Sequence, residues 1–189
     1  MSGADLGPVT AAVEAALGEK PRVILALDGM AAAGKTTAAE TLARRWAAPV
    51  VHMDDFFLPP ALRTPERLAE PGGNVHYERF AAEVLPYLKA GEPFAYRVFD
   101  CSRMTYGERA EIAAAPVVIV EGAYALHPRF GSYADVTVFF SVDPAEQRRR
   151  VLARNGAEGW EAFRTRWIPL ENAYHAACRT RERADIVIG

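Results

Sequence analysis

The chain of 189 residues is half hydrophobic and 24% charged, as expected of a globular protein with one sizeable core. Its formal net charge of −2 gives no basic bias toward nucleic acid or an anionic membrane surface, so we expect neither as a partner. The two cysteines, Cys101 and Cys178, form no Cys-x-x-Cys pair, which argues against a zinc site or a disulfide scaffold and favours the reducing cytoplasm.

The N-terminal part predicts a short amphipathic helix over residues 9–17 and then a strand over residues 22–27. The strand is apolar on both faces, as is usual for a buried parallel strand. The N-terminus lacks the basic start and continuous apolar core of a signal peptide. No apolar run approaches the roughly 20 residues that span a bilayer.

Residues 29–36 follow this strand and match G-x-x-x-x-G-K-[ST], the pattern of a phosphate-binding P-loop, before a helix predicted to reach about Trp46. The backbone N–H groups of such a loop and the helix N-terminus converge on a phosphate. The lysine adds a positive charge, and the threonine hydroxyl can ligate Mg²⁺. We therefore expect a triphosphate to be bound by Gly29, Ala31, Ala32, Ala33, Gly34, Lys35, Thr36 and Thr37. A loop that binds nucleotide without turnover is the alternative.

A second short strand, residues 50–53, is followed by two acids and two aromatics, residues 54–57. Asp54 is our candidate to accept the proton of an acceptor hydroxyl, because a carboxylate here would face the terminal phosphate. Asp55 could help to hold Mg²⁺ through water. The alternative for both acids is the capping of a turn.

Residues 58–113 are predicted to form an acceptor-binding insertion. Its first part, residues 58–74, is rich in Pro and Gly and too long for an idle connection, which is typical of a lid or a binding loop. A helix over residues 77–89, distorted at Pro86, precedes a strand over residues 94–99, for which residues 111–113 are a candidate partner.

Three aromatic residues of this region, Phe57, Tyr96 and Phe99, are suited to stack on a planar acceptor. The alternative for each is packing in the core. His52 and His76 are either ligands of the acceptor or hydrogen-bonded structural residues.

Residues 116–120 form the clearest buried strand, and residues 136–140 form another. The alternation of strands and helices predicts a parallel sheet, whose ligand lies outside the carboxyl ends of the strands. Glu121 ends one such strand, where an acid of the Walker B type is expected; the alternative is a carboxylate that only accepts backbone hydrogen bonds. We expect three strand ends, at residues 28–29, 54–55 and 121–122, to meet on one edge. The metal ligands predicted there are Thr36, Asp54 and Glu121.

The helix that begins at Pro144, with Asp143 as its N-cap, carries four arginines and is interrupted at residues 155–156. Arg150 and Arg154 share one face because they are four residues apart. We expect residues 145–160 to form a lid in which these two arginines neutralise charge during phosphoryl transfer, with Arg150 also contacting the nucleotide. The alternative is a solvated basic face.

Residues 160–178 are predicted to be helical with a kink at Pro169, and residues 184–188 to form a last strand.

Together these motifs resemble the uridine kinase-like family of P-loop kinases, a group that includes nucleoside kinases, bacterial-type pantothenate kinase and phosphoribulokinase. The resemblance spans roughly residues 22–188 and depends on the P-loop, Asp54 to Phe57, Glu70 to Val75, Tyr96 to Asp100, Val120 to Tyr124 and the arginine helix. It implies an α/β fold of the P-loop NTPase type. This is a three-layer sandwich with a five-stranded parallel sheet, helices on both faces and an arginine-bearing lid, in one domain of residues 1–189 with an N-terminal helix within 1–20.

The resemblance also implies roles for single residues. Asp54 matches the general base for a sugar 5′-hydroxyl, Lys35 and Thr36 match the contacts to ATP and Mg²⁺, and Phe99 matches an aromatic that stacks on the base, usually a tyrosine. His76 falls where these enzymes carry an aspartate that holds the ribose hydroxyls. A neutral histidine binds a diol less strongly than a carboxylate does, because charge-assisted hydrogen bonds are the stronger ones.

The function predicted is therefore that of an ATP- and Mg²⁺-dependent kinase acting on a small hydroxyl compound, most plausibly the 5′-OH of a pyrimidine nucleoside. Substrate contacts are expected from Asp54, Phe57, His76, Tyr96, Phe99 and Glu121. One alternative is a pantothenate kinase or a kinase of another small metabolite or sugar. An alternative of another class is a nucleotide-sensing P-loop ATPase that acts on a protein partner. A homo-oligomer is compatible with the sequence.

Overall fold

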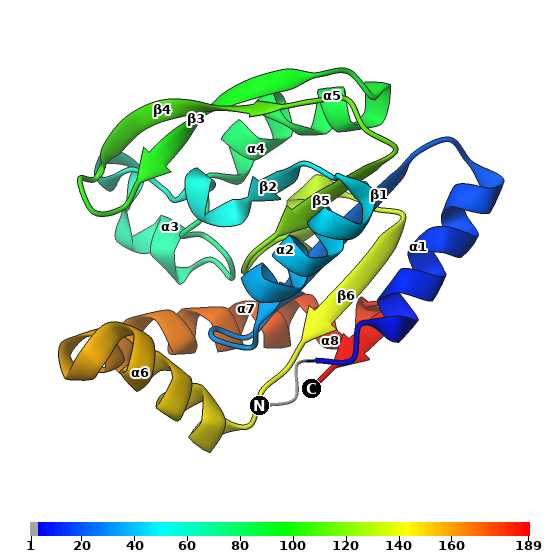
Figure 1. The fold of residues 1–189 in the computed structure, drawn as a ribbon. Coiled ribbons are helices and arrows are strands. Elements are labelled where there is room, and N and C mark those ends of the chain that lie inside the picture. Colours follow the sequence, from blue (N-terminus) through cyan, green and yellow to red (C-terminus); the bar gives the residue numbers. More distant parts are fainter. Residues whose placement is uncertain (1–3) are drawn as a thin grey trace.

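A parallel β-sheet lies at the centre of the computed structural model, which describes residues 4–189, and a two-stranded antiparallel sheet lies to one side of it (Figure 1). In this part of the chain the strands are β1 (Val23–Gly29), β2 (Val50–His52), β3 (Phe94–Asp100), β4 (Thr105–Ile112), β5 (Val117–Glu121), β6 (Val136–Phe140) and β7 (Ile186–Ile188). The helices described are α1 (Gly7–Glu19), α2 (Lys35–Trp46), α3 (Pro65–Ala69), α4 (Tyr77–Glu83), α5 (Leu85–Ala90), α6 (Pro144–Ala162), α7 (Ile168–Cys178) and α8 (Thr180–Arg183). Single turns of 3₁₀-helix are η1 (Met53–Phe56), η2 (Pro60–Leu62) and η3 (Pro128–Phe130), and η4 (Phe163–Trp167) is a π-helical turn.

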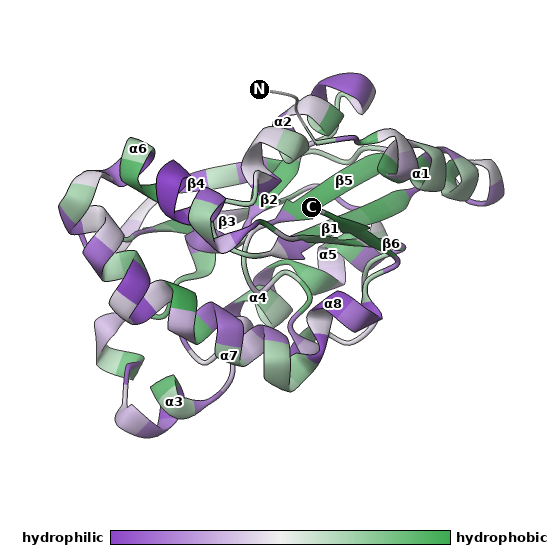
Figure 2. Cartoon of the chain, turned by 90° about the horizontal axis from the view of Figure 1, so that it is seen from below, coloured by the Kyte–Doolittle hydropathy of each residue, from purple (hydrophilic) through white to green (hydrophobic). Residues whose placement is uncertain are grey.

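The central sheet has the strand order β2-β5-β1-β6-β7, and all its neighbouring strands are parallel. Its two faces are covered by different elements because the side chains of β1 alternate. Val23, Leu25 and Leu27 pack with α1 and α2, whereas Ile24 and Ala26 pack with α4, α5 and Tyr174 of α7. Figure 2 shows the strands of this sheet as hydrophobic. The predicted three-layer arrangement around a five-stranded parallel sheet is confirmed.

The carboxyl ends of the strands meet at one edge, as predicted. His52 at the end of β2 is in register with Glu121 at the end of β5, and the N–H of Gly122 donates to the carbonyl of Leu27 (3.0 Å). Gly29 leaves β1 with φ +131°, and a Cβ there would lie 2.1 Å from the carbonyl oxygen of Phe140. The glycine is therefore required both for this backbone conformation and for the close approach of β6.

The segment between β2 and β5 contains more structure than the sequence predicts. Its first part is closed by a bridge between Phe57 and Val75, and it carries η2 and α3, the latter capped by the hydroxyl of Thr64. The helix predicted over residues 77–89 is two helices, α4 and α5, separated at Val84. The partner of β3 is the whole of β4 rather than residues 111–113 alone. This strand is mostly exposed and polar, so it lacks the apolar alternation that identifies a strand in sequence.

The regular geometry of the C-terminal helices is interrupted at a glycine and next to a proline. Gly156 has φ +70° inside α6, and the π-helical η4 precedes Pro169 in the first turn of α7. A π-turn is a known way to accommodate such a disturbance in a continuous helix. None of the helices within residues 4–189 is long and apolar enough to cross a membrane.

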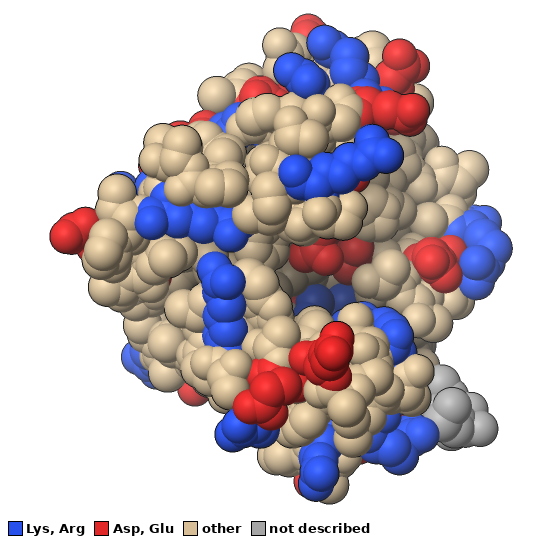
Figure 3. Space-filling model, turned by 90° about the vertical axis from the view of Figure 1, so that its left-hand side faces the viewer, with Lys and Arg blue, Asp and Glu red and all other residues tan. Residues whose placement is uncertain are grey.

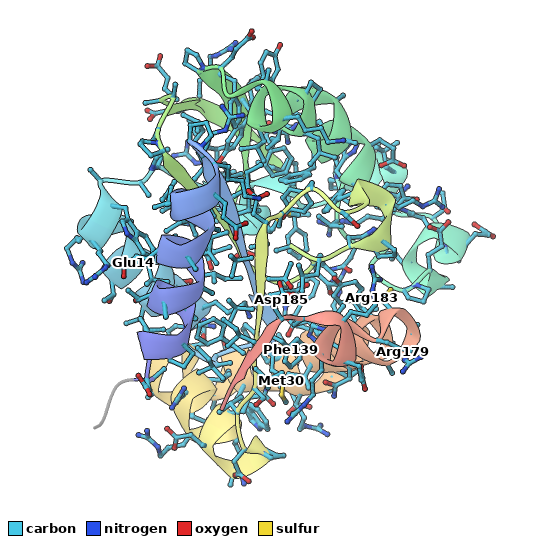
Figure 4. All side chains as sticks on the ribbon, turned by 90° about the vertical axis from the view of Figure 1, so that its right-hand side faces the viewer. Glu14, Met30, Phe139, Arg179, Arg183 and Asp185 are labelled. Atoms are coloured by element: carbon cyan, nitrogen blue, oxygen red, sulfur yellow. The ribbon has the colours of Figure 1, made fainter. Side chains whose placement is uncertain are left out.

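Side chains also join the outer elements to one another and to the sheet. Glu14 of α1 pairs with Arg45 of α2 at 2.5 Å. Asp185, just before β7, accepts hydrogen bonds from the backbone N–H and the hydroxyl of Thr137 in β6 (2.8 and 2.7 Å). Glu14 and Asp185 are labelled in Figure 4, which views the molecule from the side of α1 and β7. The bonds of Asp185 hold the edge strand against β6.

Asp28, in the last part of β1, is fully buried. One carboxylate oxygen accepts the N–H groups of Gly29 (2.6 Å) and Tyr124 (3.1 Å). The other accepts the N–H of Leu126 (2.9 Å) and the hydroxyl of Tyr174 (2.8 Å). A single charge thus joins the P-loop, the segment after β5 and helix α7, and these four donors compensate for its burial.

We predict that Asp28→Asn lowers the free energy of unfolding by about 3 kcal/mol, because the new amide would direct N–H groups at backbone and hydroxyl donors. Nucleotide binding should weaken as well, since the P-loop begins at this residue. Denaturant titration and equilibrium nucleotide binding measure the two effects.

Asp135→Asn is the matched control. Asp135 accepts the N–H of Ile24 (2.6 Å) near the other end of β1 and pairs with exposed Lys20 (2.6 Å). Its loss should cost only about 1 kcal/mol and leave nucleotide binding intact. Equal losses for the two variants would contradict the special position of Asp28.

Candidate functional site

A cleft of about 1810 Å³ opens at the carboxyl edge of the sheet. This volume exceeds the roughly 300–1,000 Å³ of a site for one small ligand, so the cleft has room for two ligands side by side. Its walls are the P-loop, the start of α2, the turn after β2, part of the 58–113 segment, and the helices α6 and α7. Figure 3 looks into this hollow, where acidic and basic side chains lie on the floor and Lys and Arg side chains stand around the rim.

The P-loop forms one wall of the cleft, and α2 begins at Lys35, directly after Gly34 with φ +101°. The ammonium group of Lys35 is buried and donates to the carbonyls of Gly29 (2.6 Å) and Met30 (2.8 Å). The predicted phosphate contacts from Ala31 to Thr37 all line the cleft. Gly29 lies behind them at the end of β1 and serves the loop through its backbone.

Two of the three predicted metal ligands are in contact. The hydroxyl of Thr36 donates to one oxygen of Glu121 (3.2 Å), and Nδ1 of His52 lies 2.6 Å from the other. The hydrogen bond to Glu121 raises the pKa of His52, against the opposing effect of burial. His52 therefore orients Glu121, and oxygen donors of this kind fit Mg²⁺.

Asp54 lies in the same cleft as Lys35, Thr36 and Glu121. Its side chain is open to the cleft, but the surrounding walls displace bulk water. This desolvation, followed by the negative charge of Glu121, raises the pKa of Asp54, while the charge of Lys35 lowers it. Within residues 4–189, no group of three His, Cys, Asp or Glu side chains is arranged to hold a metal ion by itself.

Helix α6 brings Arg150 and Arg154 to the cleft. The guanidinium of Arg150 donates to Glu146 (2.7 Å) and to the carbonyl of Ala32 in the P-loop (3.0 Å). Arg154 donates to the side chain of Asn155 (2.8 Å) and lies over the ring of Phe163. Arg150 is thus already in contact with the phosphate-binding loop, whereas Arg154 lines the cleft further out.

The predicted acceptor residues divide into two groups. Phe57 and Phe99 line the cleft. Tyr96 lies in the core, where its hydroxyl donates to Asp55 (2.8 Å) and its ring packs on Phe56. His76 is away from the cleft lining and caps α4, accepting the N–H of Arg79 (3.3 Å).

Comparison with protein-family models and with curated proteins finds no match. Among solved structures, a possible uridine kinase from Bacillus stearothermophilus superposes with a TM-score of 0.69 over 95% of this chain and 98% of that chain, at 18% sequence identity. YFH7 from Saccharomyces cerevisiae, described as a candidate P-loop-containing kinase with a circular permutation, gives 0.71 over 97% and 98%, at 14% identity. The chain shares the fold of these two structures. The expected α/β sandwich around a five-stranded parallel sheet is thereby confirmed.

The sequence does not predict every residue at this edge of the sheet. His52 is hydrogen-bonded to Glu121, which is the structural alternative for this residue, and the pairing could be inferred because the two residues end neighbouring strands. Arg63, Arg166 and Glu171 also line the cleft. They lie on a loop and on the C-terminal helices, where no motif distinguishes them.

Glu171 of α7 accepts the N–H of Ala31 in the P-loop (2.8 Å). Burial, reinforced by the negative charges of Asp28 and Asp54 and opposed by Lys35, raises its pKa to about 7. One backbone N–H group of the P-loop thus already donates to a carboxylate of the protein itself. Because it is protonated more readily than an ordinary glutamate, its charge varies across neutral pH.

We predict that Glu171→Gln stabilises the protein at pH 8 and changes it little near pH 4.5. The folded state binds a proton more tightly than the unfolded state, so the contribution of Glu171 to stability falls as pH rises from the ordinary value of 4.5 through about 7. The side-chain carbonyl of glutamine can still accept the N–H of Ala31, and because glutamine does not ionise, stability is not lost as pH rises. The gain at pH 8 should be about 1–3 kcal/mol, below the limit of about 3.4 kcal/mol that the difference between a pKa of 4.5 and one of about 7 sets.

Chemical denaturation at pH 4.5, 6, 7 and 8 measures this difference. The control is Glu182→Gln on exposed α8, whose profile should run parallel to that of the wild type. A parallel profile for Glu171→Gln would contradict the raised pKa.

Proposed function

We propose that the protein is an ATP-dependent kinase that transfers the γ-phosphoryl group to a hydroxyl of a small molecule. The observation that carries this proposal is one cleft in which Asp54 lies with Lys35 and Thr36 of the P-loop. A P-loop alone serves many nucleotide-binding proteins. A carboxylate of raised pKa facing the loop adds the base that phosphoryl transfer to a hydroxyl needs.

In the proposed mechanism the triphosphate lies along the loop from Ala31 to Thr37. Lys35 leaves its loop carbonyls to contact the terminal phosphates, and Arg150 lies beside the loop to neutralise charge that develops in transfer. Mg²⁺, when bound, supplies further charge neutralisation at the phosphates, and Thr36, Asp54 and Glu121 are the residues that would hold it. Asp54 orients the acceptor hydroxyl and takes its proton.

The proposed acceptor end of the cleft is the side of Phe57, which directly precedes the 58–113 segment, and of Phe99 within it. Residues 145–160 are the proposed lid, of which Arg150 and Arg154 reach the cleft. A pyrimidine nucleoside, the acceptor implied by the family resemblance, is supported by Phe99 but not by Tyr96 or His76, which are away from the cleft. Other small metabolites with a primary hydroxyl are therefore the second candidate.

We predict that Asp54→Asn lowers acceptor-dependent turnover by about 10²–10⁴-fold, because it removes the general base. Binding of ATP should stay within a few-fold of the wild type. Lys35→Ala should lower both turnover and ATP binding, because its charge contacts the donor. Steady-state transfer from labelled ATP and equilibrium binding of an ATP analogue measure the two effects.

Asp100→Asn is the control for the loss of a carboxylate. Asp100 caps an exposed turn by accepting from Ser102 (2.6 and 2.8 Å) outside the cleft lining. Full activity of Asp54→Asn would refute its role as base. Slow ATP hydrolysis that no small acceptor accelerates would instead favour a nucleotide-sensing ATPase.

A further inference from the structure

Two arginines from distant parts of the chain meet at the acceptor end of the cleft. Arg63 lies between η2 and α3, and its Nε donates to the carbonyl of Leu58 (2.6 Å). Arg166 lies in η4. Both line the cleft together with Phe57, Phe99 and Trp167, while neither belongs to the P-loop or to helix α6.

Aromatic rings hold the two guanidinium groups in place. The Cζ atom of Arg63 lies 5.7 Å from the ring centre of Phe57, and that of Arg166 lies 4.5 Å from the ring centre of Trp167. The two rings meet edge to face, with centres 5.3 Å apart. A ring beside a guanidinium restricts its orientation, and the terminal N–H groups, which for Arg63 exclude the Nε that donates to Leu58, are left to bind an anion.

These two charges are not neutralised by the protein. Within residues 4–189, no ion pair joins either arginine to an acid, whereas Arg67, Arg79 and Arg150 each have a glutamate partner. Burial, followed by the positive charge of Arg166, lowers the pKa of Arg63. Two like charges close together without a carboxylate are unfavourable, and an anion bound between them would relieve the repulsion.

We propose that Arg63 and Arg166 form an anion-binding subsite, and that the phosphoryl acceptor carries a carboxylate or a phosphate group besides its reacting hydroxyl. This inference rests on the proposed kinase function and narrows its acceptor from any small hydroxyl compound to an anionic one. The planar fork of a guanidinium matches both carboxylate and phosphate geometry. An unmodified nucleoside lacks such a group.

The position of the pair separates it from the donor. The phosphates of ATP are served by the P-loop, Lys35 and Arg150. The pair instead lines the cleft with Phe57 and Phe99, and its guanidinium groups lie beside the rings of Phe57 and Trp167. The pair is therefore assigned to the end of the cleft that we propose for the acceptor.

The first experiment measures binding when the donor half is filled. The protein is saturated with Mg²⁺ and a non-hydrolysable ATP analogue and titrated by calorimetry with glycerol, glycerate and glycerol 3-phosphate. Glycerate and glycerol 3-phosphate separate the carboxylate from the phosphate source. We expect at least one anionic probe to bind about 10-fold or more tightly than glycerol, and Arg63→Gln or Arg166→Gln to weaken that probe by about 10- to 100-fold, the range of a hydrogen bond to a charged group.

The second experiment measures transfer from labelled ATP to neutral and anionic acceptors that are otherwise matched, namely pantothenol with pantothenate and uridine with uridine 3′-phosphate. In each pair that reacts, the anionic member should have the lower KM, and the arginine variants should raise that KM while leaving the KM for ATP unchanged. Arg164→Gln is the matched control, because Arg164 lies two residues from Arg166 and pairs on the surface with Glu161 (2.5 Å). It should behave like the wild type.

Three results would overturn the proposal: no saturable binding of any anionic probe, equal binding of neutral and anionic probes in all variants, or a raised KM for ATP in the arginine variants. The last would assign the pair to the donor. Arginine-dependent anion binding without transfer to any acceptor would leave the subsite in place and refute the kinase function instead. Thermal unfolding of each variant confirms that the fold is retained.

Discussion

The cleft depends on the buried charge of Asp28. A carboxylate without water needs hydrogen-bond donors on all sides, and here they come from three separate parts of the chain: Gly29, residues Tyr124 and Leu126, and Tyr174. The start of the P-loop, the segment after β5 and α7 are therefore placed relative to one another by one group. Any change in this arrangement would leave a buried charge with too few partners.

Helix α7, which binds Asp28 through Tyr174, also reaches the P-loop through Glu171. These two residues are three apart and so lie on one face of the helix. One binds the N–H of Ala31 and the other binds Asp28. Helix α6 repeats this arrangement, because Gln147 and Arg150, also three apart, donate to the carbonyls of Ala31 (3.0 Å) and Ala32 (3.0 Å). The loop between β1 and α2 is thus held by both C-terminal helices.

Most of the fold could be predicted from the sequence, because buried strands such as β1 and β5 are apolar throughout and the P-loop pattern defines its own strand and helix. The donor half of the cleft follows from these motifs. The acceptor half does not. Tyr96 and Phe99 have similar side chains, and their odd spacing of three places them on opposite faces of β3. Alternation does not say which face meets the cleft, and only the packing of β3 leaves Tyr96 in the core while Phe99 lines the cleft.

Histidine residues leave two roles open in sequence, and His76 takes the structural one, since it caps the helix that follows it. Pairs of residues from distant parts of the chain are beyond prediction. Arg63 and Arg166 are ordinary surface residues in sequence, separated by about a hundred positions, and only the packing of Phe57 on Trp167 brings them together. Such pairs depend on the tertiary structure of loops, for which local patterns carry no information.

The distribution of charge across the cleft explains why such a pair would be needed. Asp54, Glu121 and Glu171 line the cleft beside Lys35 of the P-loop, so carboxyl groups outnumber this lysine where the acceptor hydroxyl is proposed to arrive. An anionic acceptor would be repelled from these carboxyl groups by coulombic interactions that a partly desolvated cleft screens poorly. Arg63 and Arg166 would attract the anionic group at the far end of the acceptor and so offset this repulsion. Asp54, at the end near the reacting hydroxyl, would remain free to take the proton. Separation of the two charges along the cleft would thus orient the acceptor as well as bind it, with its hydroxyl toward Asp54 and its anionic group toward Arg63 and Arg166.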